Sequence, residues 1–195
     1  MPRALRAVAL GLLLALAGCN AAPPPPAPLP ELTWGRLPPF ELDVSTVAID
    51  DAYRPAPGGG HVENEMPVPP AVAAERWARD RLRAVGRAGT ARFTIAEASV
   101  VAVPLSRNGG LSGTFTDQQT LRYDARLSVR LEVENLAQGR SGMVTAEASR
   151  SQTVAEKATP EERRRLQFAL VEALLEQVNG ELEKSIPLYL GPYLR

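Results

Sequence analysis

The stretch Leu121–Val133 reads Leu-Arg-Tyr-Asp-Ala-Arg-Leu-Ser-Val-Arg-Leu-Glu-Val and decides the fold. Its odd-numbered residues are apolar, and its even-numbered residues are charged or polar. A period of two places these two sets on opposite faces of a β-strand. In a helix, at about 100° per residue, the apolar residues would spread around the whole axis. The pattern therefore predicts a long strand of an antiparallel sheet that is covered on one face only.

Three more strands and two helices are expected around this strand. The strands are predicted at 40–50, 90–105 and 142–154, and the first helix runs from Pro70 to about Val85. Changes of phase near Thr46–Val47 and near Glu97 suggest β-bulges. The second helix is predicted at 160–186, because Thr159–Glu162 forms a capping box and Pro187 follows the apolar stripe. The predicted fold class is α+β (β-α-β-β-β-α), a mainly antiparallel four-stranded sheet with both helices packed on one face.

Length and charge limit the classes of function. The chain has 195 residues, with 22 Lys and Arg against 22 Asp and Glu. Removing residues 1–18, which contain Arg3 and Arg6, leaves 20 basic against 22 acidic residues. Such a balance gives no electrostatic reason to expect nucleic acid as a partner. We expect a single α+β domain at 40–195, preceded by accessory segments.

The first 18 residues have the pattern of a targeting segment. Arg3 and Arg6 precede an apolar run, Ala7–Ala17, which is shorter than the roughly 20 helical residues that span a bilayer. The run ends in Leu-Ala-Gly-Cys, residues 16–19. A cleavable secretory signal with an incidental cysteine, or an uncleaved anchor, is the alternative interpretation.

Leu16–Cys19 resembles the bacterial lipobox, in which the signal peptide is cut before a cysteine that carries lipid. The resemblance implies a lipoprotein signal peptide at 1–18 and lipidation of Cys19, which would hold the protein on the periplasmic side of the envelope. It further implies that Asn20 favours the outer membrane over the inner membrane. Cys19 is the only cysteine, so an intrachain disulfide is excluded. The proline-rich run 21–30, within a tether at 19–39, predicts a polyproline spacer of about 30 Å or a disordered link.

The order of elements, together with the lipobox and the tether, resembles small envelope lipoproteins with an α/β roll. These include the LPS-assembly lipoprotein LptE, the auxiliary lipoproteins of ABC-type transport systems and the N-terminal domains of the CsgG/TolB type. The resemblance implies a non-catalytic accessory or scaffold role with an envelope protein as partner. It extends over about residues 40–186 and concerns architecture, so no binding residue is carried over from it.

Candidate partner-binding residues lie on the charged face and in one loop. Arg122, Arg126 and Arg130 form a row that is interrupted by Asp124 and Glu132. Such a row could meet an acidic partner or lipid headgroups, although charge pairing across strands is the alternative. Asn108 and Phe115 lie in the glycine-rich connection 106–119 and are the remaining candidates.

The residues required for common catalytic and metal sites are largely missing. His61 is the only histidine, so a zinc site is not expected, and we predict a solvated side chain in the long loop 51–69. The motif 108–113 lacks the Gly-Lys-Ser/Thr ending of a phosphate loop, which favours a flexible connection. Acidic residues at 43, 50, 51, 63 and 65 could pair or bind calcium, although an exposed acidic loop is the simpler interpretation. We expect no enzyme activity, no metal and no cofactor; the alternative function is a carrier of a lipid or other apolar ligand between helices and sheet.

Overall fold

The computed structural model describes residues 28–106, 119–135 and 139–195. The predicted signal peptide, Cys19, Asn108 and Phe115 lie outside these ranges. The elements follow in the order β1 (Phe40–Leu42), β2 (Thr46–Asp51), η2 (Glu63–Glu65), α2 (Pro70–Arg81), β3 (Leu82–Ala84), β4 (Thr90–Pro104), β5 (Gln119–Asn135), β6 (Arg140–Ala155), α3 (Pro160–Leu190) and η5 (Gly191–Tyr193). No helix in the described ranges is long and apolar enough to cross a membrane.

Strand β5 confirms the prediction made from its period of two. Its odd-numbered side chains from Tyr123 to Val133 are at most 4% exposed, whereas Arg126 and Arg130 are exposed. β4 and β6 flank β5 in antiparallel register, with Leu127 opposite Ala98 on one side and Ala148 on the other. We call the side of the sheet that carries Leu127 the inner face and the side that carries Arg126 the outer face.

The predicted α+β class is confirmed, but the four-stranded sheet is mixed. The strand order is β2-β4-β5-β6, and β2 pairs with β4 in parallel. The prediction of a mainly antiparallel sheet did not specify this parallel pair, although a crossover through a helix, as between β2 and β4, is the usual link between parallel neighbours. The remaining two pairings in the sheet are antiparallel.

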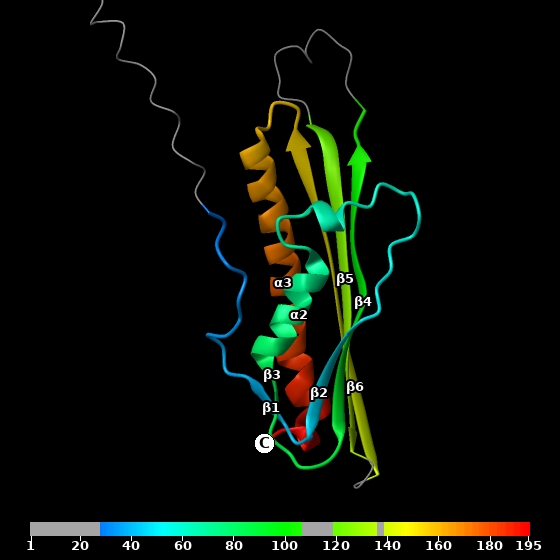
Figure 1. Cartoon of the computed structure of the whole chain (residues 1–195), viewed down its shortest axis with the longest axis vertical. Helices are drawn as coiled ribbons and strands as arrows, with labels where there is room; N and C mark the ends of the chain where they lie inside the picture. The colour runs from blue at the N-terminus through cyan, green and yellow to red at the C-terminus, as the bar shows by residue number, and fades with distance from the viewer. Residues whose placement is uncertain (1–27, 107–118, 136–138) are drawn as a thin grey trace, which may run out of the picture.

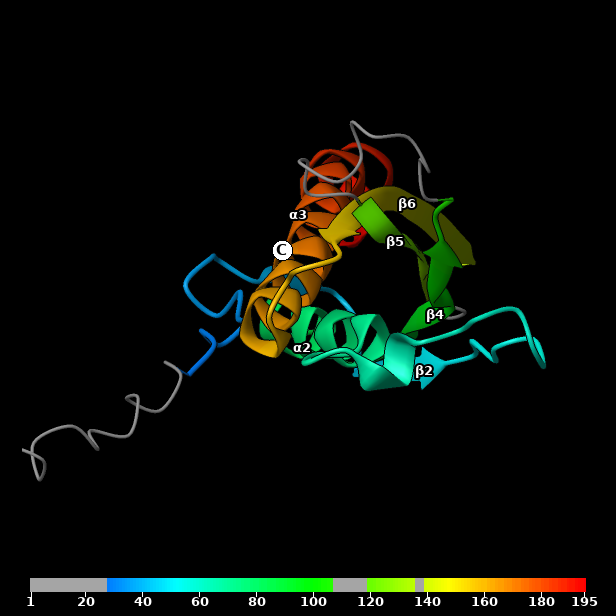
Figure 2. The same ribbon diagram turned by 90° about the horizontal axis from the view of Figure 1, so that it is seen from above.

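Both helices lie on the inner face of the curved sheet, as Figure 1 and, from above, Figure 2 show. Trp77 of α2 connects the helices to the sheet, because its ring stacks on Phe93 of β4 with ring centroids 5.5 Å apart. Its indole Nε1 also donates a 2.8 Å hydrogen bond to Asn179 Oδ1 of α3. A buried indole N–H needs such an acceptor, which explains an asparagine in the middle of a helix.

The predicted strand 40–50 is two strands in two sheets, and the first helix is shorter than expected. The chain bends between β1 and β2, and β1 pairs in parallel with β3 in a separate two-stranded sheet. α2 therefore ends at Arg81 instead of Val85, since pairing with β1 overrides the helical pattern of the next residues. Gly86 lies against this bend, and a Cβ there would come within 2.6 Å of the Val44 backbone nitrogen.

Helix α3 begins where the capping box predicted but ends later. Thr159 Oγ1 accepts a 3.2 Å hydrogen bond from the Glu162 backbone N–H, and Glu162 Oε2 accepts one from the Thr159 N–H at 2.8 Å. The prediction that Pro187 ends the helix is wrong, because α3 continues to Leu190. Ile186 and Leu190 are both fully buried, and this apolar packing offsets the hydrogen bond that proline cannot make.

Chain segments outside the main elements also contribute to the core. Leu32 and Trp34 are 5% and 8% exposed, so packing extends N-terminal of residue 40. Asp80 Oδ2 of α2 accepts hydrogen bonds from Thr33 Oγ1 at 3.0 Å and from the Trp34 N–H at 2.8 Å. Residues 28–34 therefore lie along α2 instead of standing away from the domain, as Figure 1 shows.

Candidate functional site

A β-bulge in β4 positions the first residues of the candidate site. The register shifts between Ile95 and Glu97, as the change of phase predicted, and Ala96 is the extra residue. Before the bulge, Phe93 and Ile95 face inward; after it, Ala98 and Val100 do so. The shift therefore turns Glu97 and Ser99 to the outer face.

The loop 52–62 lies across the outer face beside this part of β4. The backbone of Val62 donates to the Val100 carbonyl at 2.8 Å, and that of Ala102 donates to the Gly60 carbonyl at 2.9 Å. Gly60 has φ +72°, and a Cβ there would lie 3.0 Å from the Ala102 oxygen, so the close approach requires glycine. Ser99 is only 6% exposed under this loop, which corrects the prediction that the outer face is uncovered throughout.

A partly buried polar network of Tyr53, His61 and Glu63 holds the loop in place. Glu63 is 5% exposed, and its carboxylate accepts hydrogen bonds from Tyr53 Oη at 3.1 Å and from the Val100 N–H at 3.3 Å. His61 Nδ1 lies 3.3 Å from Tyr53 Oη and 3.4 Å from Glu63 Oε2. The prediction that His61 is solvated is wrong, because its side chain is 22% exposed and contacts both partners.

These contacts assign the tautomer of His61. Tyr53 has one hydroxyl proton, which it donates to Glu63, so the proton between Tyr53 Oη and His61 comes from Nδ1. Burial raises the pKa of Tyr53 to about 12, and the hydrogen bond to Glu63 and the negative charges of Glu63 and Glu97 add to this effect.

The three arginines of the predicted row have different surroundings. Arg122 binds Asp124 through Nε at 2.9 Å and Nη2 at 2.8 Å, and Ser151 of β6 donates to the same carboxylate at 2.6 Å. Hydrogen bonds from Arg122 and Ser151 hold the pKa of Asp124 below its usual range, and the same carboxylate raises the pKa of Arg122. Arg130 lies 4.0 Å from Glu132. Arg122 and Arg130 thus both have acidic partners on their own strand.

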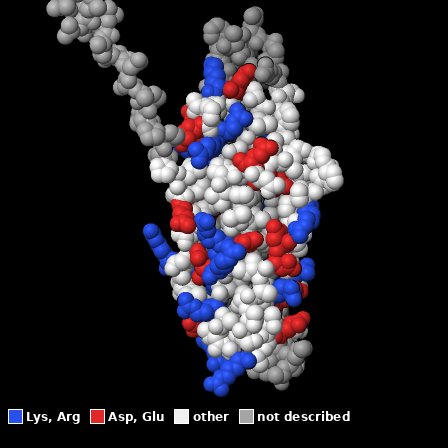
Figure 3. Space-filling model, viewed as in Figure 1, with Lys and Arg blue, Asp and Glu red and all other residues white. Residues whose placement is uncertain are grey.

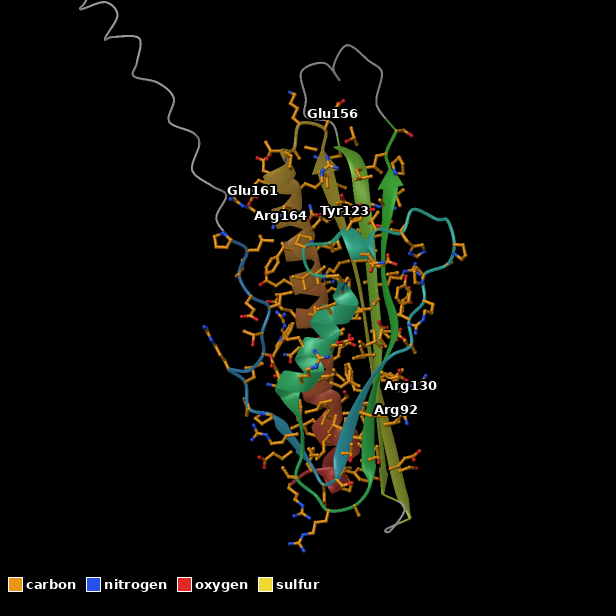
Figure 4. The ribbon with its side chains drawn as sticks, viewed as in Figure 1. Arg92, Tyr123, Arg130, Glu156, Glu161 and Arg164 are labelled. Carbon is orange, nitrogen blue, oxygen red and sulfur yellow. The ribbon has the colours of Figure 1, made fainter. Side chains whose placement is uncertain are left out.

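Charge pairing across strands also occurs on the outer face. Arg92 of β4 lies 4.0 Å from Asp50 of β2. Figure 4 labels Arg92 and Arg130, which come from neighbouring strands in the lower half of the sheet. In Figure 3, basic and acidic side chains are interspersed over the visible face instead of being separated by sign. Pairing therefore accounts for much of the arginine row, but Arg126 has neither a hydrogen bond nor an ion pair with another described residue.

Arg126 lies at a cleft of about 720 Å³ between loop 52–62 and the outer face. We call this pocket the outer-face cleft. Its polar lining consists of Tyr53, Arg54, His61, Glu97, Ser99, Asp124 and Arg126. The cleft offers positively charged, negatively charged and neutral hydrogen-bonding side chains above the paired strands β4 and β5. This arrangement suits a polar or charged group of a partner.

Two common catalytic arrangements are not formed among the described residues of the cleft. Ser99 Oγ donates its 2.8 Å hydrogen bond to Glu97 Oε1 and not to an imidazole, so the pair of a serine with a histidine base is not assembled. Within the ranges that the structure describes, no group of three or more His, Cys, Asp or Glu side chains is arranged to hold a metal ion.

The space between α3 and the sheet is filled by side chains. Phe168, Val171, Leu174 and Leu175 of α3 are at most 5% exposed. Gln167 Nε2 donates a 3.1 Å hydrogen bond to the buried Tyr123 hydroxyl. A hollow of about 560 Å³ with an alanine-rich lining lies at the start of α3, beside Ala155, Ala158, Leu166 and Ala169. The binding of an apolar ligand between helices and sheet stays a prediction.

The sequence identified Arg126 but missed Tyr53 and Glu97, and it named Glu63 only as one of five acidic residues that could pair or bind calcium. A signal for the loop is present in hindsight, because three consecutive glycines precede His61 and Glu63, which are spaced as in a strand. His61 does form a bridge with Val101. Tyr53 gives no local signal, because its contacts depend on how the loop returns to β4.

The comparisons with known proteins are sparse. No protein-family model matches the chain, and no curated protein matches it. Among solved structures, the chain is similar to a PelC dodecamer from Paraburkholderia phytofirmans, at 13% identity, covering 72% of this chain and 92% of that chain, with a TM-score of 0.21. A likeness at this TM-score supports no inference about fold or function.

Proposed function

We propose that this chain is a non-catalytic accessory protein, anchored by lipid on Cys19 to the periplasmic side of the envelope, where it binds an envelope or transport-system partner. The outer membrane is the preferred location, given Asn20. The anchor rests on the lipobox-like residues 16–19. The partner-binding role rests on the outer-face cleft.

One observation supports the binding role above all others. Arg126 is exposed at the rim of a cleft whose loop wall is held by the partly buried network of Tyr53, His61 and Glu63. A buried carboxylate such as that of Glu63 is costly unless its hydrogen bonds are satisfied, and here those bonds fix a loop over a charged surface. A partner that places a carboxylate against Arg126 would form a charge-assisted hydrogen bond on a preorganised surface.

The test is site-specific photo-crosslinking in intact cells. A photoreactive residue at Arg126 should give a discrete adduct, whereas the same residue at Arg164 on α3, where Figure 4 labels the side chain, should not. Exchanging Tyr53 for Phe should weaken the Arg126 adduct, because the loop loses a hydrogen bond to Glu63. An anchored, folded protein that yields no adduct at Arg126 would contradict the proposal.

A further inference from the structure

Strand β6 forms one lateral edge of the four-stranded sheet, and its odd-numbered residues present backbone groups there. The Glu147 N–H donates a 3.0 Å hydrogen bond to Glu181 Oε2 of α3, not to β5. The carbonyl of Thr153 accepts from the side chain of Gln152 at 2.9 Å. In an antiparallel pair, alternate residues direct both backbone groups away from the partner strand. Thr145, which has the same parity as Glu147, therefore faces the free edge as well.

The two edges of the sheet differ in length and in protection. The opposite edge is the six-residue β2, and residues 60–62 pair with β4 beyond it. β6 has 16 residues, contains neither proline nor lysine, and shows no register shift along Leu121–Asn135 of β5. Short strands, charged side chains, prolines, bulges and cover by a helix are the usual means of blocking an edge. β6 is long and has no proline, and the groups that cap its outward backbone are side chains: Glu181 on the Glu147 N–H, Gln152 on the Thr153 carbonyl and, at 3.4 Å, Arg150 on the Ser149 carbonyl. Thr145, Ser149 and Ser151 of β6 are exposed and small.

Helix α3 supplies one wall beside this edge. A hollow of about 550 Å³ is lined by Glu147, Ala148 and Ser149 of β6 and by Gln177 of α3, and it continues over the neighbouring strands to Ala96, Glu97, Arg126, Leu127 and Ser128. Gln177 Oε1 is buried and has no hydrogen-bond partner among the described residues. An edge strand beside a helix is the arrangement that binds an added peptide strand, with backbone bonds for affinity and flanking side chains for selectivity.

We propose that β6 and α3 bind an extended segment of a partner protein, which adds to the sheet as a fifth strand and carries a Lys or Arg opposite Glu147. Charge complementarity selects this occupant, since Glu147 and Glu181 are both acidic and adjacent. The incoming carbonyl replaces Glu181 as acceptor of the Glu147 N–H, and the released carboxylate pairs with the incoming cation. A second copy in register at this point would bring acidic residues together, and the chain's own run 21–30 contains six prolines, which lack the donors of a strand.

The test uses the full-length protein in its native envelope. Photoreactive residues are placed singly at Thr145 and Ser149, and the crosslinked partner positions are mapped by mass spectrometry. Strand addition requires that the two sites map four residues apart on one segment, with a Lys or Arg between them. Scattered positions, or positions in β6 of a second copy, would overturn the proposal.

Matched variants test the backbone and charge components separately. Thr145→Pro removes an outward N–H without removing a bond to β5, whereas Thr145→Val retains it. We expect Thr145→Pro to reduce the Ser149 adduct about tenfold, which corresponds to one lost hydrogen bond, and Thr145→Val to leave it unchanged. Glu147→Lys, at an exposed position that folding tolerates, should reduce the adduct similarly through repulsion. If neither variant reduces the Ser149 adduct, strand addition is rejected. If the Arg126 adduct still forms in the same cells, the failure concerns the β6 edge alone and not the proposed function.

Discussion

The two faces of β5 are built from the same strand but are ordered by different means. On the inner face, the odd-numbered residues from Tyr123 to Val133 are buried against α3 and the neighbouring strands. On the outer face, Arg122 and Arg130 pair with acidic residues two positions away, and of the described segments the loop 52–62 adds cover. The inner face therefore determines stability, whereas the outer face is free to carry a binding surface.

The largest expected effect separates two adjacent residues on opposite faces. Leu127→Ala should lower the free energy of unfolding by about 3 kcal/mol, because it removes a buried side chain and leaves a cavity. Arg126→Ala should change it by less than about 0.5 kcal/mol, since the side chain is exposed. Urea unfolding of the detergent-solubilised protein measures both, and equal losses would contradict the assignment of faces.

A smaller loss of unfolding free energy is expected from replacing Glu63, the buried carboxylate beside the outer face. Glu63→Ala leaves the Tyr53 hydroxyl and the Val100 N–H without their acceptor, and should cost about 2 kcal/mol. Hydrogen exchange at Val62 and Ala102 should accelerate, because their bonds hold the same loop. Glu65→Ala, in the same turn but exposed, is the control and should leave exchange unchanged. Similar exchange in the two variants would show that the network does not hold the loop.

The next expected effect appears only at alkaline pH. Because the folded protein holds the Tyr53 proton up to a pKa of about 12, while an unfolded tyrosine titrates near 10, the free energy of unfolding should fall between pH 10 and pH 12. Tyr53→Phe should remove this component of the slope. Ultraviolet difference spectroscopy should show a late-titrating tyrosine in the original protein, and this component should be absent from Tyr53→Phe.

The smallest expected effect concerns the exposed pair of Arg122 and Asp124. The pKa of Asp124 is lowered, so its contribution to stability is present above its ordinary value and is lost as the pH falls through the folded value. Asp124→Asn should lower Tm by at most about 2 °C at neutral pH, and by less in high salt. A large, salt-independent change would mean that this part of the outer face is buried by a partner or by another segment.

The inner face could be predicted because its information is local. The period of two in β5 and the capping box of α3 each depend on residues a few positions apart, and both predictions are confirmed. The pairing within Arg122–Asp124 is equally visible at a spacing of two. Such signals need no knowledge of which elements meet in space.

The remaining features depend on contacts between distant segments. The parallel pairing of β2 with β4, the conversion of 82–84 to strand and the continuation of α3 through Pro187 each follow from tertiary packing that overrides local preference. The outer-face cleft requires Tyr53 and Glu63 to meet across a glycine-rich return of the chain. No periodicity encodes that return, so only the arginine rim of the site could be predicted.

Cysteine accessibility along β5 tests the division of faces most directly. Cys19 is the only native cysteine, so single replacements can be compared with the unsubstituted protein in their reaction with a maleimide. Arg126→Cys and Ser128→Cys should react readily in the folded protein, whereas Ala125→Cys and Val129→Cys should react only after unfolding. Equal reactivity at the four positions, or the reverse order, would contradict the account.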